Sequence, residues 1–211
     1  MIQLGDRIRA FATVGKMLRR LDDREKEHIF QRAKAENSWF TEESITLALE
    51  GVQRYLDEEK LQQWTEGLPD NPSRPQKIGV VMAGNIPMVG FHDFLAVLIT
   101  GHQLMAKLSS KDSFLIRYIA EMLTDIEPWF TEQVDFRERL NEADAMIATG
   151  SDNSSRYFEY YFANMPHIIR RNRSSVGVLD GKETSEDLEA LGRDAFQYFG
   201  ERHPGKNTYK H

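Results

Sequence analysis

The 211-residue sequence contains no cysteine. This absence excludes disulfide bonds, thiolate metal ligands and a thiol nucleophile within these residues. No stretch approaches the roughly 18 to 20 consecutive apolar residues that a membrane-spanning helix needs. The N-terminal residues carry charges where a signal peptide would have an apolar run. We therefore expect a cytoplasmic protein without a membrane span.

Positive charge is in the minority. Lysine and arginine number 27 against 33 aspartates and glutamates, which gives a formal net charge of -6 at pH 7. Proteins that bind nucleic acid draw most of their affinity from clustered Lys and Arg, so we expect no nucleic-acid partner. The one dense basic cluster runs from Arg170 to Arg173. It is interpreted either as a solvated turn or as a contact to an anion such as a nucleotide phosphate.

Several catalytic motifs are also missing. The six histidines are scattered, without an H-E-x-x-H motif or a close pair, so no metal site is expected. The sequence has neither a G-x-S-x-G nucleophile elbow nor the G-x-G-x-x-G dinucleotide fingerprint. Residues 200–207 approach the P-loop spacing, but Asn207 stands where the P-loop has Ser or Thr, and the segment follows a predicted helix. Phosphate transfer through Lys206 is therefore the least favoured interpretation.

Residues 1–66 are predicted to form amphipathic helices that act as a lid or support. Apolar residues recur there at helical spacing, first from Ile8 to Leu21 and again from Ile45 to Leu56. Thr41 resembles a helix N-cap, with Ser44 in place of the usual Glu at the third helical position. Five aromatic residues of the chain are expected to be packing residues and not a cofactor box: Phe11, Phe30, Trp39, Trp64 and Trp129.

A segment rich in proline, residues 67–75, separates the helical part from the rest of the chain. Neither a helix nor a central strand tolerates this composition, so we place a domain boundary there. Residues 76–200 are assigned to the second domain. Residues 201–211 are assigned to a tail without periodic character.

Strands and helices alternate through the second domain. Strands are predicted over residues 77–83, 102–108, 145–149 and 175–179, and helices over residues 88–100, 113–124, 152–163 and 185–199. Short apolar strands separated by such helices are typical of a parallel sheet buried on both faces. The sequence therefore predicts an α/β protein: a Rossmann-like parallel sheet with helices on both faces, preceded by an N-terminal helical segment.

Three turns of this pattern follow predicted strands. They cover residues 83–87, 108–112 and 149–153. In a doubly wound sheet, ligands bind outside the carboxyl ends of the strands, where helix N-termini present free N–H groups. We therefore expect the three turns to line one crevice.

Each turn carries residues that have two interpretations. Asn85 could donate a hydrogen bond to a developing oxyanion, or only shape a tight turn. Lys107, at the end of a predicted strand, could contact a ribose hydroxyl or a phosphate, or extend into water as an edge charge. Gly150 allows the backbone to approach a pyrophosphate closely, and Ser151 could contact it or only cap the following helix. Spacing alone leaves these alternatives open.

Together, the turns and their flanking residues resemble one family. The stretches that carry the resemblance are AGNIP at 83–87, TG at 100–101, MAKLSSKD at 105–112, ATGS at 148–151 and SVGVLDG at 175–181. As a set they are similar to the bacterial long-chain acyl-CoA reductases within the aldehyde dehydrogenase superfamily. That family includes the fatty-acid reductase component of bioluminescence systems. The resemblance covers about residues 36–200.

The resemblance implies reduction of a long-chain acyl-CoA to a fatty aldehyde by NADPH, with NADH as the alternative dinucleotide. In the family a cysteine attacks the thioester, and hydride transfer to the acyl-enzyme releases the aldehyde. Asn85 matches the residue that stabilises the oxyanion. Lys107 matches the lysine near the adenosine ribose, and Gly150 with Ser151 matches the pair under the cofactor pyrophosphate. The other cofactor-binding positions implied in this way are Ala83, Gly84, Ser109 and Ser110.

Departures from the family pattern remove the nucleophile. The family's cysteine follows a helix that ends near Gly200, whereas Glu201 to His203 stand there in this sequence. No glutamate matches the general base of hydrolytic aldehyde dehydrogenases, because residues 168–173 carry arginines instead. We therefore expect the cofactor-binding portion of an acyl-CoA reductase, inactive by itself. The alternative is a non-catalytic dinucleotide-fold module for binding or assembly, with a homo-oligomer as one form.

Overall fold

The computed structural model describes residues 2–150, 152–171 and 176–196. The chain begins with four helices, which are α1 (Leu4–Leu18), α2 (Asp23–Glu36), α3 (Glu42–Tyr55) and α4 (Glu58–Trp64). Local capping explains where α3 begins: the Thr41 side chain accepts from the Ser44 N–H, and the Ser44 hydroxyl accepts from the Thr41 N–H. The predicted N-cap is therefore confirmed, with Ser44 completing the capping box.

The remaining elements build a five-stranded sheet. In chain order they are β1 (Lys77–Val81), α5 (Phe91–Ile99), β2 (Gln103–Lys107), α6 (Phe114–Ile126), η1 (Pro128–Glu132), β3 (Val134–Phe136), β4 (Ala145–Thr149), α7 (Asp152–Phe162), β5 (His167–Arg170) and α8 (Ser185–Phe196). The strand order is β3-β2-β1-β4-β5, and every neighbouring pair is parallel. The predicted α/β fold class is confirmed.

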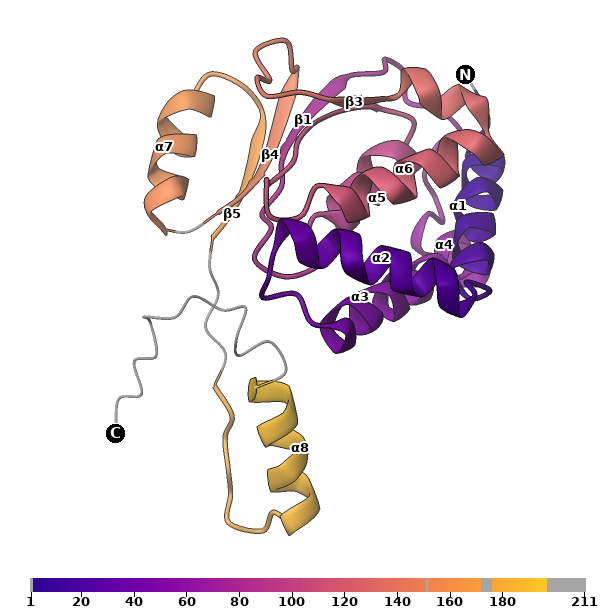
Figure 1. The fold of residues 1–211 in the computed structure, drawn as a ribbon. Helices are drawn as coiled ribbons and strands as arrows, with labels where there is room; N and C mark the ends of the chain where they lie inside the picture. Colours follow the sequence, from indigo (N-terminus) through magenta and orange to yellow (C-terminus); the bar gives the residue numbers. More distant parts are fainter. Residues whose placement is uncertain (1, 151, 172–175, 197–211) are drawn as a thin grey trace.

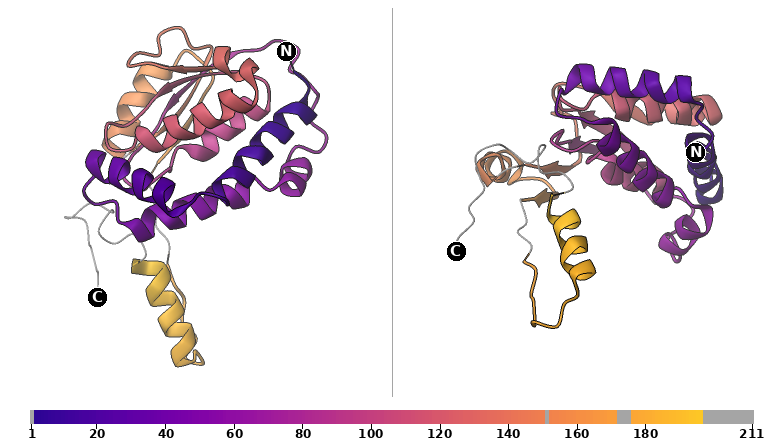
Figure 2. Two further views of the ribbon diagram at one scale, coloured as in Figure 1. Left: turned by 45° about the vertical axis from the view of Figure 1, so that its right-hand side comes forward. Right: turned by 60° about the horizontal axis from the view of Figure 1, so that its bottom comes forward.

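Helices cover both faces of the sheet. Figure 1 shows α5 and α6 on one face, with α7 on the other face beside β4 and β5. The N-terminal helices pack outside α5 and α6, so this side of the molecule is the thicker one. α8 projects away from the sheet in all three ribbon views (Figures 1 and 2) and buries none of its residues.

The hydrophobic core runs without interruption from the N-terminal helices to the sheet. Phe11 of α1 is fully buried and packs edge-on against Phe94 of α5 and Phe130 of η1. Arg7 of α1 is also fully buried, and its guanidinium donates to the backbone oxygen of Asp70 in the proline-rich segment. The two predicted domains, residues 1–66 and 76–200, therefore share one hydrophobic core. That they are separate domains stays a prediction.

Four expectations need correction. No strand forms over the described residues 176–179 of the stretch 175–179. The strand that extends the sheet beyond β4 is instead β5, which was not predicted because two of its four residues are polar and the strand lies at the sheet edge. β3 was missed because it has only three residues. Helix α5 begins three residues later than predicted because Met88 has a φ of 59°, which is incompatible with a right-handed helix.

Two of the five aromatic residues expected to pack are exposed. The exposed fractions are 54% for Trp39 and 47% for Trp64, whereas Phe30 and Trp129 pack against the core with Phe11. Among the described residues, no helix is long and apolar enough to cross a membrane. The P-loop-like residues 200–207 lie outside the described part of the chain.

Candidate cofactor-binding site

The centre of the sheet contains a topological switch point. The chain leaves β1 toward α5 on one face, and it leaves the neighbouring strand β4 toward α7 on the opposite face. Diverging connections of this kind open a crevice outside the carboxyl ends of the two strands, where ligands of doubly wound sheets bind. The three turns predicted from the sequence all begin at this edge, at the ends of β1, β2 and β4.

The turns after β1 and β2 are in direct contact at Gly84. A Cβ atom built on Gly84 would lie 2.5 Å from both the Cβ and the Oγ of Ser109 and 3.2 Å from the Cβ of Asp112. The buried Asp112 carboxylate accepts a 2.7 Å hydrogen bond from the N–H of Met88, which directly follows the first turn and has a left-handed conformation. Only glycine allows the two turns to approach this closely.

The C-terminal end of α2 also lies at this edge. The Glu36 carboxylate accepts from the N–H groups of Ser113 and Phe114 at 2.7 and 2.9 Å, and from the Ser113 hydroxyl at 2.6 Å. The N-terminus of α6 is thus already occupied by a protein carboxylate and offers little to an external anion. Helix α5, in contrast, has Gly90 as its N-cap residue and no side-chain cap.

Asn37, which follows α2, connects the loop between α2 and α3 to the first turn. Its buried side-chain amide donates to the Gly84 carbonyl at 3.4 Å, and its Oδ1 accepts from the Trp39 N–H at 3.1 Å. One side chain therefore ties the exposed Trp39 to the turn that carries Asn85. Asn85 itself is exposed.

The turn after β4 is packed against α7. A Cβ on Gly150 would lie 2.9 Å from the Phe158 ring and 3.0 Å from the Cβ of Ser154, so a larger residue would have to displace the first turns of α7. The Gly150 N–H donates to the Arg170 carbonyl at 3.2 Å, which keeps the turn beside β5. Ser151 lies outside the described residues.

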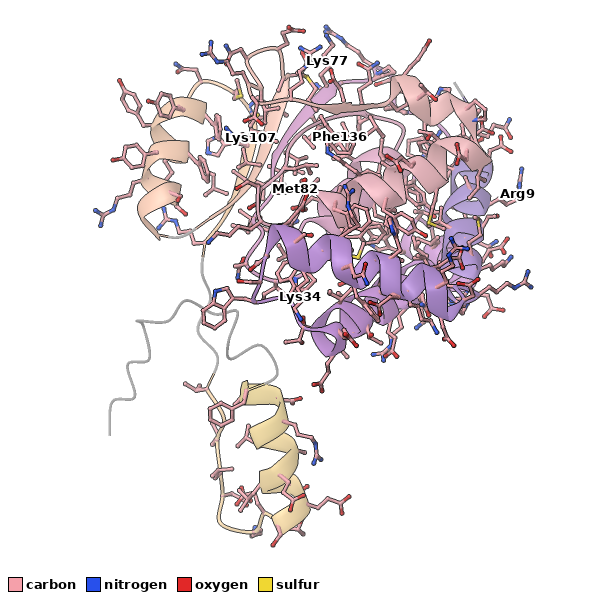
Figure 3. The ribbon with its side chains drawn as sticks, viewed as in Figure 1. Arg9, Lys34, Lys77, Met82, Lys107 and Phe136 are labelled. Atoms are coloured by element: carbon pink, nitrogen blue, oxygen red, sulfur yellow. The ribbon has the colours of Figure 1, made fainter. Side chains whose placement is uncertain are left out.

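Lys107 stands at the carboxyl end of β2, directly opposite Val81 of β1. Its ammonium lies 3.5 Å from the Glu138 carboxylate, and the side chain is 46% exposed. Ser109 is half-buried and its hydroxyl accepts from the Lys111 N–H, whereas Ser110 is exposed. Figure 3 labels Lys107 together with Lys77, the first residue of β1, and Met82, which directly follows β1. Ala83 follows Met82 and is half-buried.

An ion pair between Arg170 of β5 and Asp93 of α5 lies beside these turns. The two groups approach to 2.6 Å, and the Asp93 side chain is only 4% exposed. Burial raises the pKa of Asp93, and the positive charge of Arg170 opposes that rise. Arg171 pairs with Glu159 of α7. The two described arginines of the basic cluster are therefore paired with carboxylates of the chain, which favours a structural role for them over an anion contact.

The structure thus brings most of the predicted site residues to one edge. Gly84 and Ser109 are in contact, Ala83 follows the end of β1, and Lys107 and Gly150 end the strands on either side of β1. Sequence reasoning missed Glu36, Asn37, Trp39 and Asp93. No local pattern could have found Glu36 or Asn37, because their partners lie 77 and 47 residues away.

Neither a family model nor a curated protein sequence matches the chain. Several solved structures, however, are similar to it in fold. Aldehyde dehydrogenase 21 from Physcomitrella patens, solved with the product succinate, superposes with a TM-score of 0.70 at 14% identity over 94% of this chain and 46% of its own. An aldehyde dehydrogenase from Bacillus cereus, solved with NAD+, gives 0.68 at 14% identity over 94% and 45%. An NAD-dependent benzaldehyde dehydrogenase from Corynebacterium glutamicum gives 0.63 at 13% identity over 80% and 42%.

These similarities define the fold. The described residues have the Rossmann-like fold of aldehyde dehydrogenases, including the helical N-terminus. The chain spans less than half the length of these structures. At such low identity the similarity concerns the fold, and the reaction has to be argued from the residues of this chain.

Proposed function

We propose that the chain binds NADP(H) at the carboxyl edge of β1, β2 and β4, as the cofactor-binding portion of an acyl-CoA reductase. The observation that carries the proposal is the pair of glycines beside the switch point. Gly84 and Gly150 follow the two strands that flank it, and neither position has room for a side chain. Glycine at these positions lets the turns pack tightly at the carboxyl ends of the strands, which is where ligands of doubly wound sheets bind.

The residues around the crevice fit a dinucleotide. Gly150 and Ser151 would hold the pyrophosphate near the start of α7, and Ala83 with Gly84 would line the path toward Asn85. Lys107, Ser109 and Ser110 would bind the adenosine ribose. These assignments agree with those implied by the resemblance to acyl-CoA reductases.

The charges at the end of β2 support NADP over NAD. Lys107 and Lys111 lie there, and a 2'-phosphate needs such cations. The nearby carboxylates are engaged: Asp112 is buried against the Met88 N–H, and Glu138 pairs with Lys107. Asp112, the acidic residue of the turn 108–112, is thus occupied within the protein, which disfavours it as a partner for the free 2'-hydroxyl of NAD.

The chemistry available to these residues is limited to binding and polarisation. Bound NADPH would supply the hydride, and the Asn85 amide would donate a hydrogen bond to the oxygen that becomes negative during thioester reduction. Formation of an acyl-enzyme needs a thiolate, and the 211 residues contain no cysteine. We therefore expect these residues to bind cofactor without turning over acyl-CoA.

A pair of matched lysines tests the proposal. Lys107 is the last residue of β2, and Lys77 is the first residue of the neighbouring strand β1, so the two lie at opposite ends of the strands. Each side chain is 46% exposed, and each ammonium pairs with a glutamate, at 3.5 Å for Lys107 and 3.6 Å for Lys77. In titration calorimetry, Lys107→Ala should weaken NADPH binding about tenfold, the order expected for one charge-assisted contact, while Lys77→Ala should leave it unchanged. Equal effects, or no NADPH binding by the unmodified protein, would contradict the proposed site.

Intrinsic fluorescence gives an independent measurement. Trp39 is exposed and tied to the Gly84 carbonyl through Asn37. NADPH in the crevice should quench its emission, and Trp39→Phe should remove most of that quenching. Trp64→Phe is the control, because Trp64 is also exposed but contacts His92 on the side of α5.

The second candidate function is a non-catalytic assembly module. It is favoured by one observation, namely that α8 buries none of its residues although its apolar side chains form a stripe. An amphipathic helix without cover is typical of a segment that packs against a partner.

A further inference from the structure

Asn37 is held in one orientation by its own polar groups. It directly follows α2 and is buried, with 8% of its surface exposed. Its backbone N–H donates to the Ala33 carbonyl at 3.0 Å, and its backbone carbonyl accepts from the Phe40 N–H at 2.9 Å. Its side-chain oxygen accepts from the Trp39 N–H at 3.1 Å, and its side-chain amide donates to the Gly84 carbonyl at 3.4 Å. The amide therefore cannot turn without breaking the bonds at both ends of the side chain.

The chain is also anchored on both sides of Asn37. Glu36, the residue before it, accepts hydrogen bonds from two N–H groups and one hydroxyl at the start of α6, the helix that follows β2. Phe40, three residues after it, is 1% exposed and belongs to the hydrophobic core. The Asn37 amide therefore reaches the turn after β1 from a support that is fixed to the α/β part of the molecule.

The bond to Gly84 determines how the next residue is presented. The Gly84 carbonyl and the Asn85 N–H belong to one peptide unit, and the described part of the chain contains no cis peptide bond. In a trans peptide the C=O and the N–H point in opposite directions. The Gly84 carbonyl points toward the buried Asn37 amide, so the Asn85 N–H points away from it, and Asn85 is exposed. Asn37 therefore sets the orientation of the peptide unit that leads into Asn85.

We propose that Asn37 is a positioning residue for the nicotinamide half of the dinucleotide. The inference rests on the proposed function, in which the Asn85 amide donates to the oxygen of the group being reduced. Because the hydride comes from the nicotinamide ring, that ring has to lie close to Asn85. The adenosine half is assigned instead to Lys107, Ser109 and Ser110 at the end of β2. Loss of the Asn37 amide should therefore affect the two halves of the cofactor differently.

Two substitutions at position 37 remove the amide donor. Asn37→Asp has nearly the same shape and keeps an oxygen for the Trp39 N–H, but its carboxylate has no proton to donate to the Gly84 carbonyl. Asn37→Ser introduces no charge, and its hydroxyl ends one bond short of the position of the amide nitrogen, so it tests the proposal even if the charged variant does not fold. The matched control is Asn71→Asp in the proline-rich segment. There the side-chain oxygen already accepts from the Arg7 guanidinium at 3.0 Å, so the same change keeps the bond.

Titration calorimetry with two ligands separates the halves of the cofactor. The ligands are NADPH and adenosine 2',5'-bisphosphate, which has the adenosine half without nicotinamide. Both Asn37 variants should weaken NADPH binding about five- to tenfold, the order expected for one hydrogen bond, and should leave binding of the bisphosphate unchanged. Lys107→Ala should weaken the binding of both ligands, and Asn71→Asp should weaken neither.

The comparison of ligands distinguishes positioning from a general effect on the fold. Equal weakening of both ligands by Asn37→Ser would overturn the proposal, because a loss of structure does not select one half of the cofactor. NADPH binding that is the same in Asn37→Ser as in the unmodified protein would also overturn it. If the unmodified protein binds neither ligand, the proposed function itself fails and this inference fails with it.

Discussion

Arg7→Met should destabilise the protein strongly although Arg7 is far from the candidate site. The guanidinium is fully buried and donates to the backbone oxygens of Ile2, Asp70 and Ile99 at 2.5, 2.6 and 2.8 Å, and to Asn71 Oδ1 at 3.0 Å. Burial lowers the pKa of Arg7, and Asp70 and Asp6 oppose that shift. One side chain thus joins α1, the proline-rich segment and the end of α5.

The expected loss of stability follows from the oxygen atoms that would lose their hydrogen-bond donor when methionine replaces Arg7. A hydrogen bond from a charged group contributes about 1.5 to 3 kcal/mol net, and leaving a buried acceptor unpaired costs about 1 to 3 kcal/mol. Three of the four bonds are only partly buried, so water can replace some of them. We therefore expect a loss of about 3 to 5 kcal/mol in the free energy of unfolding, as for removing one partner of a buried polar network.

Urea denaturation followed by far-UV circular dichroism measures this loss. The matched control is Arg9→Met, because the Arg9 side chain is 66% exposed and pairs only with the neighbouring Asp6. Its cost should stay below about 0.5 kcal/mol. A loss below about 1 kcal/mol for Arg7→Met would refute the reasoning, and would mean that water satisfies the freed carbonyls.

Three further predictions concern the site. Gly84→Ala should lower the free energy of unfolding by about 1 to 3 kcal/mol, because the added methyl group overpacks the two turns, and it should also weaken NADPH binding. The control is Gly51→Ala, where a Cβ meets nothing within 4 Å. This variant should instead stabilise α3 by about 0.5 to 1 kcal/mol. Glu36→Ala should cost about 1 to 2 kcal/mol in urea denaturation, because α6 loses its cap. The raised pKa of Asp93 means that the folded state binds this proton more tightly than the unfolded state. Its contribution to stability should therefore decline as the pH rises from near the ordinary carboxyl value of 3.8, and the pH dependence of urea denaturation should be flatter in Asp93→Asn.

Signals within a few residues determined much of the fold. The alternation of apolar strands with helices was sufficient to place β1, β2, β4 and the helices between them, and β4 occupies the predicted residues. Thr41 and Ser44 determined the start of α3, because both partners of a capping box lie in one turn. The three turns were also predictable, since parallel strands present their carboxyl ends at one edge.

Contacts between distant residues decided the rest. Residues 176–179 have the composition of a strand but form none, because a strand needs a partner for its backbone groups and none lies beside them among the described residues. β5 forms despite a weak pattern because β4 supplies that partner. Glu36 caps a helix that begins 78 residues later, and Asn37 holds Gly84. Sequence alone therefore predicted which turns gather at one edge of the sheet, and packing decided that Glu36 at the end of α2 caps the helix after one of them and that Trp39 stands beside another.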